Sequence, residues 1–116
     1  MQLNGVMLFV AELEPMLAFY RDALGFRPKA EMQFEDWVEF DTAEAHFSLH
    51  LIPRQYLVKP SPAPRDMATV KPILAVDTLA GLRERLADAG ATILDRPWGT
   101  WDFADPEGNV VGLVER

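Results

Sequence analysis

Polar and apolar residues alternate along several short stretches in the first half of the chain, as is typical of strands with one buried face. These stretches are residues 3–10, 27–34, 37–41 and 46–52. Between the first two, Leu17, Tyr20 and Leu24 follow the three-and-four spacing of a helix. Pro15 suits the first turn of that helix, because its missing N–H costs little there, and Gly25 suits its end. The pattern therefore predicts strand, helix and three further strands.

The second half of the chain repeats this order. Its predicted strands are residues 69–76, 92–96, 100–104 and 109–115. A helix is predicted between the first two, with Asp77 or Thr78 as its cap and Gly90 at its end. Its apolar stripe consists of Leu79, Leu82, Leu86 and Ala89.

The repeat predicts one α+β domain over residues 1–116, built from two tandem βαβββ modules. The modules are residues 1–52 and 69–116, and residues 53–68 form a linker between them. Prolines at 53, 60, 62 and 64 exclude a helix or a central strand from the linker. Because each module alone would expose one apolar sheet face, the two modules are expected to pair.

Composition narrows the classes of function. Hydrophobic residues make up 49% of the chain, which is enough for a core, but no apolar run approaches the ~20 residues of a membrane span. A net charge of −7 disfavours nucleic acid as a partner. The absence of cysteine excludes disulfides and thiolate chemistry, and the N-terminus shows no signal-peptide pattern. We therefore expect a cytoplasmic protein with no membrane or nucleic-acid partner.

Two short motifs occupy corresponding places in the two halves. The segment FYRDALGF (residues 19–26) runs from a helix end into a strand, and DPEGN (residues 105–109) is a tight turn before the last strand. Together with the repeat, these motifs resemble the vicinal oxygen chelate superfamily of glyoxalases, extradiol dioxygenases and bleomycin-resistance proteins. The resemblance implies that the two modules form a cupped mixed sheet, and it implies a homodimer.

The resemblance also implies where a divalent metal would be held. Enzymes of the family take their ligands, usually His, Glu or Gln, from the first and last strand of each module. Motif register places these positions at Gly5, Ser48, Lys71 and Gly112. Glycine has no ligating side chain, serine is a weak ligand, and a lysine ammonium repels a cation. We therefore expect no metal and no other cofactor, as in the bleomycin-resistance branch.

The two histidines do not replace this set. His46 and His50 are four residues apart, which along a strand separates them by ~13 Å at ~3.3 Å per residue. One metal cannot reach both of them at a bond length of ~2.0–2.1 Å. A polar, partly solvated strand face is the interpretation preferred for His46.

Strand alternation assigns side chains to the inside of the expected cup. The predicted ligand-binding residues are Met7, Phe9, Trp37, Glu39, Ser48, His50, Lys71, Trp98, Trp101 and Gly112. Glycines at two ligand positions would enlarge the cavity, and Glu39 and Asp102 could attract a cationic ligand. The Trp-Gly step at 98–99 resembles the bleomycin-resistance branch, although core or dimer packing is the alternative role of both tryptophans.

Three hypotheses of function follow. The leading one is a metal-free protein that binds a small aromatic or cationic molecule, such as an antibiotic, without turnover. The second is a lyase, isomerase or dioxygenase in which His50, with Glu39 or Lys71, supplies acid–base chemistry near neutral pH. The third is a module that binds a partner protein through the proline-rich linker.

Overall fold

The computed structural model describes residues 1–57 and 70–116, which fall into two compact units within residues 1–58 and 59–116. Within these described ranges, no helix is long and apolar enough to cross a membrane.

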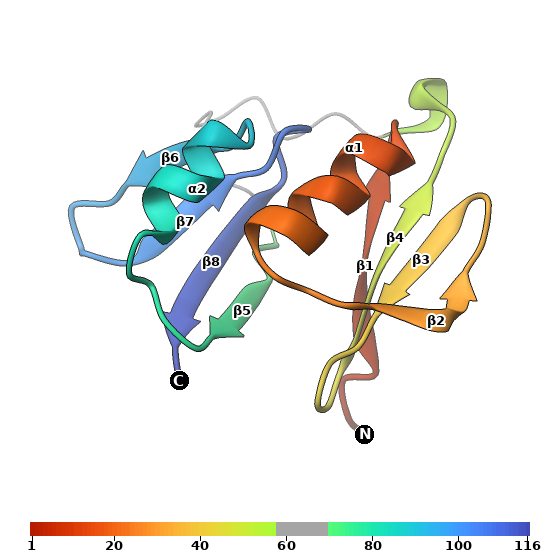
Figure 1. Cartoon of the computed structure of the whole chain (residues 1–116), viewed down its shortest axis with the longest axis horizontal. Coiled ribbons are helices and arrows are strands. Elements are labelled where there is room, and N and C mark those ends of the chain that lie inside the picture. The colour runs from red at the N-terminus through yellow and green to blue at the C-terminus, as the bar shows by residue number, and fades with distance from the viewer. Residues whose placement is uncertain (58–69) are drawn as a thin grey trace. The chain divides into compact units, whose positions relative to one another are not determined.

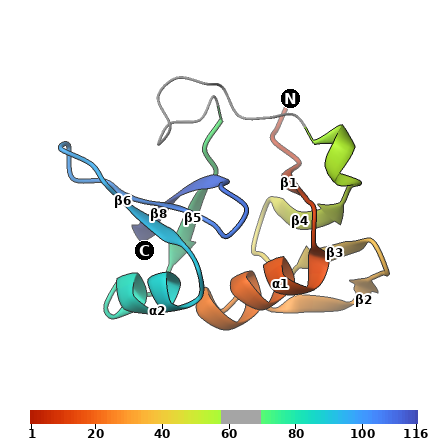
Figure 2. The same cartoon turned by 90° about the horizontal axis from the view of Figure 1, so that it is seen from above.

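The first unit holds a sheet of four strands in the order β1-β4-β3-β2 (Figure 1). Its strands are β1 (Gly5–Val10), β2 (Pro28–Gln33), β3 (Trp37–Phe40) and β4 (His46–Leu51). Strands β1 and β4 run parallel, whereas β3 is antiparallel to both β4 and β2. The helix α1 (Leu13–Ala18) covers one face of this sheet (Figure 2).

The second unit repeats this topology in the order β5-β8-β7-β6. Its strands are β5 (Ile73–Val76), β6 (Thr92–Asp95), β7 (Trp101–Ala104) and β8 (Val110–Glu115). Strands β5 and β8 are the parallel pair, and the helix α2 (Leu82–Asp88) lies on one face of the sheet (Figure 2). The prediction of an α+β fold with two tandem βαβββ modules is confirmed.

The first helix continues directly into a π-helical turn, η1 (Phe19–Ala23), which ends before Gly25. Gly25 has a φ of +82°, so this predicted helix end is correct. Tyr20 is fully buried against Phe40 and Phe47, which joins the helix to the centre of the sheet. The motif at residues 19–26 therefore builds the core of the first unit.

The second helix starts later than the sequence predicted. It begins at Leu82 with Gly81, at φ +67°, as the capping residue, so Asp77 and Thr78 do not cap it. The Thr78 side chain instead accepts a hydrogen bond from the Ala80 N–H in the preceding turn. Leu82 and Leu86 are buried as predicted, whereas Ala89 is exposed.

Two further boundaries differ from the predicted ones. Within the described residues strand β5 begins at Ile73, so Lys71 lies before the strand, because Pro72 has no N–H to donate to the ladder. One 3-10 turn, η2 (Arg54–Tyr56), forms at the start of the predicted linker, where the sequence indicated no helix. Residues 58–69, which include most of the linker, lie outside the described residues.

The turn at residues 105–109 has the predicted conformation. The buried Asp105 carboxylate accepts hydrogen bonds from the N–H groups of Glu107 and Asn109, and Gly108 has a φ of +89°. This turn sets the antiparallel pairing of β7 with β8, with Phe103 opposite Val111.

Candidate ligand-binding site

Each sheet has one face that its helix does not cover, and we call these the first and second open faces. Cross-strand register sorts the predicted site residues into rows on the first open face. Phe9, His50 and Trp37 form one row, and Met7, Ser48 and Glu39 form the next. The structure therefore brings six of the ten predicted ligand-binding residues together on one sheet.

The row of Phe9, His50 and Trp37 is aromatic. Phe9 is 53% exposed and meets the His50 ring edge-on at 5.9 Å between centroids. Trp37 stacks on Phe34 at 6.0 Å, and its buried Nε1–H has no acceptor within the described residues. Met7, in the next row, is 45% exposed. This part of the sheet face is therefore apolar and aromatic, whereas a sheet face in contact with water usually carries polar residues.

Beside this row, three charged or titratable residues form a cluster that we call the Glu39 cluster. The Glu39 Oε2 accepts hydrogen bonds from Lys29 Nζ at 2.6 Å and pairs with His46 Nδ1 at 2.9 Å. The Lys29 hydrogen bond, followed by that of His46, holds the pKa of Glu39 below its ordinary value. The same bond raises the pKa of Lys29. The charge of Glu39 is therefore already matched, and it offers little attraction to a cationic ligand.

The histidine that Glu39 contacts is His46, whereas the sequence hypothesis paired this carboxylate with His50. The reason is the register, since Glu39 is opposite Ser48 and its side chain reaches along β4 toward His46. His50 has Asp36 as its nearest carboxylate, with Nε2 and Oδ2 3.8 Å apart.

The second open face carries a buried ion pair. Asp102 is opposite Gly112, and its two oxygens each accept a hydrogen bond from Lys71 Nζ at 3.1 Å. Arg96 Nε donates to Asp102 Oδ2 at 2.7 Å. Two cations thus share this carboxylate, which removes the attraction for cationic ligands that the sequence suggested, and Lys71 pairs with Asp102 in its own unit.

A cavity of about 290 Å³ opens over this ion pair. Its lining includes Lys71, Ile73, Thr100, Gly112 and Val114. Three of the ten predicted ligand-binding residues, Lys71, Trp101 and Gly112, are therefore brought together here.

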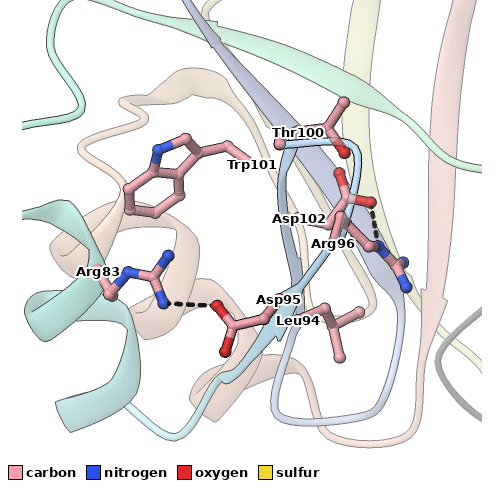
Figure 3. Close-up of a pocket in the computed structure, with 8 residues that line it drawn as sticks. Arg83, Leu94, Asp95, Arg96, Thr100, Trp101 and Asp102 are labelled. Atoms are coloured by element: carbon pink, nitrogen blue, oxygen red, sulfur yellow. Dashed lines mark hydrogen bonds and ion pairs between the residues drawn. The ribbon is translucent and has the colours of Figure 1, made fainter.

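The two tryptophans of the second unit differ in position, and Trp101 also lines this cavity. Trp101 is opposite Leu113, so its ring is on the α2 face, where the Arg83 guanidinium stands 5.0 Å from the ring centroid. Figure 3 shows Trp101 and Asp102 pointing to opposite sides of β7, around a smaller cavity of about 130 Å³. Trp98 is exposed and donates from Nε1 to the Thr100 hydroxyl at 2.8 Å. Trp101 thus contacts Arg83 of α2 and lines both cavities.

The four positions matched to metal ligands do not suit a metal. A Cβ on Gly5 would lie 2.5 Å from the His46 carbonyl oxygen, so no ligating side chain fits there without a backbone shift. A Cβ on Gly112 would lie 3.2 Å from Asp102 Oδ1 and 3.4 Å from Lys71 Cε. Gly5 therefore leaves no room for a side chain, whereas Gly112 lines the cavity of the second unit. No cluster of three or more His, Cys, Asp or Glu side chains that could hold an ion exists among residues 1–57 and 70–116.

Similarity to known proteins agrees with the repeated topology. The family model described as Glyoxalase/Bleomycin resistance protein/Dioxygenase superfamily matches residues 2–113. The chain belongs to this superfamily. No curated protein matches the sequence of this chain significantly.

Three solved structures illustrate the shared fold. A glyoxalase/bleomycin resistance protein/dioxygenase family enzyme from Burkholderia phytofirmans aligns with a TM-score of 0.77 at 20% identity, over 99% of this chain and 98% of its own. A glyoxalase-related enzyme from Fulvimarina pelagi aligns with a TM-score of 0.73 at 19% identity, over 99% of this chain and 88% of its own. A glyoxalase/bleomycin resistance protein from Albidiferax ferrireducens aligns with a TM-score of 0.71 at 17% identity, over 97% of each chain. At these identities the likeness establishes the fold alone.

Sequence reasoning missed two residues of this superfamily member's open faces, Lys29 and Arg96. Alternation alone does not place Lys29, because the register of β2 shifts between Pro28 and Gln33. Arg96 lies two residues beyond Leu94, which is opposite Asp102, so same-face spacing could have suggested its pairing with that carboxylate.

Proposed function

We propose that this superfamily member is a metal-independent binding protein for a small planar aromatic molecule. The observation that carries the proposal is the aromatic row of Phe9, His50 and Trp37, beside an exposed Met7 on the first open face. Small-molecule sites combine apolar and aromatic walls with a few orienting polar groups, and the Glu39 cluster provides such groups next to the row. If the ligand is an antibiotic, protection results from burial of the drug without turnover.

The electrostatics narrow the ligand class. Both buried carboxylates on the open faces, Glu39 and Asp102, are bonded to cations of the chain. A cationic ligand would gain little from either of them, so we favour an uncharged or anionic ring system.

Titration of the whole protein with 2-naphthol, followed by amide chemical shifts in two-dimensional NMR, tests this function. We expect saturable shifts centred on β1, β3 and β4. Phe9→Ala should weaken binding about threefold to tenfold, since an aromatic pair contributes ~0.5–1.5 kcal/mol. Tyr56→Ala, which removes an exposed ring outside the row, is the matched control and should leave binding unchanged. The absence of saturable shifts would overturn the proposal.

A second candidate function, proton transfer, is favoured by the pairing of His46 with Glu39. A carboxylate bonded to Nδ1 orients a histidine so that Nε2 can act as a general base, and the His46 side chain is half exposed. In this candidate Glu39 is a positioning residue.

Deuterium exchange tests this activity. The protein would be incubated in D₂O with phenylacetaldehyde, and loss of the methylene proton signal followed by NMR. Exchange that falls at least tenfold in His46→Gln, but not in the control His50→Gln, would support it. Exchange no faster than in buffer would remove this candidate for aromatic carbon acids.

A further inference from the structure

We propose that the Lys71 ammonium, held by Asp102 beside Gly112, anchors the carboxylate of a one-ring aromatic acid in the cavity of the second unit. This inference rests on the proposed binding function and names a ligand class for it. It concerns the cavity of the second unit alone.

The first step is the state of the ammonium. A lysine ammonium has three N–H donors, and within the described residues Lys71 directs its hydrogen bonds to the two oxygens of Asp102. One donor remains for a further acceptor. The Lys71 side chain is 31% exposed, whereas that of Asp102 is 1% exposed. Asp102 and Glu115 also line the cavity, but the cation is far more exposed to a ligand there than the Asp102 carboxylate that holds it.

The second step is the shape of the cavity. Gly112 leaves its floor open, because a Cβ there would already touch Lys71 Cε at 3.4 Å and Ile73 Cγ1 at 3.5 Å. Ile73 and Val114 are both exposed and provide apolar walls. The volume of about 290 Å³ lies near the lower end of the ~300–1,000 Å³ typical of ligand pockets, which suits a single ring.

The third step concerns the charge of the ligand. An amine ligand would meet the Lys71 ammonium, while Asp102 is buried and already shared by two cations. A carboxylate would instead form a charge-assisted hydrogen bond, which is roughly twice as strong as a neutral one. The net charge of −7 opposes anions at long range, but salt screens this repulsion beyond ~8–10 Å, so the contact with Lys71 decides affinity.

Lys71 also stands at one of the positions where the family's metal ligands are expected. Lys71 and Gly112, which motif register aligns with two of the family's ligands, both line this cavity. At these two positions the chain therefore has an ammonium and a residue without a side chain.

The experiment compares benzoate, benzyl alcohol and benzylamine as ligands of the whole protein, with amide chemical shifts as the readout. We expect benzoate to shift the amides of Ile73, Gly112 and Val114 saturably and to bind at least tenfold more tightly than the other two. Lys71→Met should weaken benzoate at least tenfold and leave benzyl alcohol unchanged. Arg116→Met is the matched control, because it removes a cation of the second unit that pairs with the exposed Asp77 and does not line the cavity. It should leave benzoate binding intact.

The inference is overturned if benzoate binds no tighter than benzyl alcohol, or if Lys71→Met leaves its affinity unchanged. If Lys71→Met does not give a dispersed, folded spectrum, Gly112→Ala provides the test, because its methyl group fills the cavity floor and should weaken benzoate. Unchanged benzoate binding in Gly112→Ala would also overturn the inference. Binding of 2-naphthol on the first open face without any preference for benzoate would leave the proposed function standing and remove only this anchor.

Discussion

Trp37 carries a buried indole N–H for which the described residues offer no acceptor. Leaving such a donor unpaired costs ~1–3 kcal/mol, and a phenyl ring in its place has no donor to satisfy. The same tryptophan belongs to the aromatic row, so its ring surface serves the proposed site while its nitrogen does not.

We therefore predict that Trp37→Phe changes the free energy of unfolding by less than about 1 kcal/mol, because the lost ring area is offset by removal of the unpaired donor. Trp98→Phe is the comparison, since it breaks the hydrogen bond from Nε1 to Thr100. Urea unfolding of the three proteins measures both changes. A loss above about 2 kcal/mol in Trp37→Phe would mean that the indole N–H has a partner.

Gly5 is required by the close approach of β4. A Cβ at this position would lie 2.5 Å from the His46 carbonyl oxygen and 2.7 Å from the His46 Cβ. We predict that Gly5→Ala lowers the free energy of unfolding by ~1–3 kcal/mol through overpacking. Gly112→Ala, whose nearest contact is 3.2 Å, should cost less. Equal losses in urea unfolding would contradict this ordering.

At the scale of secondary-structure elements, the Glu39 cluster connects β2, β3 and β4 across the first sheet. The pKa of Glu39 is lower in the folded protein than in the unfolded chain, chiefly because Lys29 donates to it. Between these two pKa values the unfolded chain binds more protons, so stability rises with pH. The contribution is complete above the ordinary carboxyl value of ~4.3 and is lost as pH falls through the lowered pKa.

We accordingly predict that Glu39→Gln is less stable than the native chain at pH 7 and that the difference shrinks as the pH falls below about 4. Urea midpoints between pH 3 and 7 measure the effect. The exposed Glu44→Gln is the control and should follow the native profile. A Glu39→Gln deficit that stays constant with pH would show that its cause is packing.

The sequence predicted the elements to different degrees. Alternation found all eight strands that the described residues form, because each sheet has one face buried under a helix. The start of α2 was misplaced, since Asp77 and Thr78 are good capping residues but Gly81 alone adopts the positive φ that the turn uses. Side-chain pairing was the least predictable, because it depends on register, which in β2 is shifted by an irregularity.

At the scale of the whole molecule, the residues at the four family ligand positions predict that the protein binds divalent metal ions poorly. We expect less than about a tenth of an equivalent of bound ion per chain after incubation with nickel, manganese, iron(II) or zinc and desalting, which is the order of weak-site carryover. Elemental analysis measures this content. Close to one ion per chain would mean that other side chains form a site and would favour a metal-dependent enzyme.

The sequence predicted which side chains share a sheet face in the candidate site, but it did not predict which charged side chains pair there. Motif register and alternation placed Met7, Phe9 and His50 on one face, as the structure has them. Trp101 lines the cavity of the second unit with Lys71 and Gly112, although the alternation of β7 puts its ring on the α2 face. The role of Asp102 depended on Arg96 and Lys71, which are distant from one another in sequence and meet only in the folded sheet.

The contact between Gly5 and His46 also has a consequence for the history of the chain. A lineage that retained this backbone could not gain a ligand at position 5 by one substitution, because the new side chain would collide with β4. At position 112 a ligand would first have to displace the pair of Lys71 and Asp102. Ligands at both positions would therefore need compensating changes in β4 and in the Lys71–Asp102 pair, so single substitutions at the two glycines are a closed route to a metal site.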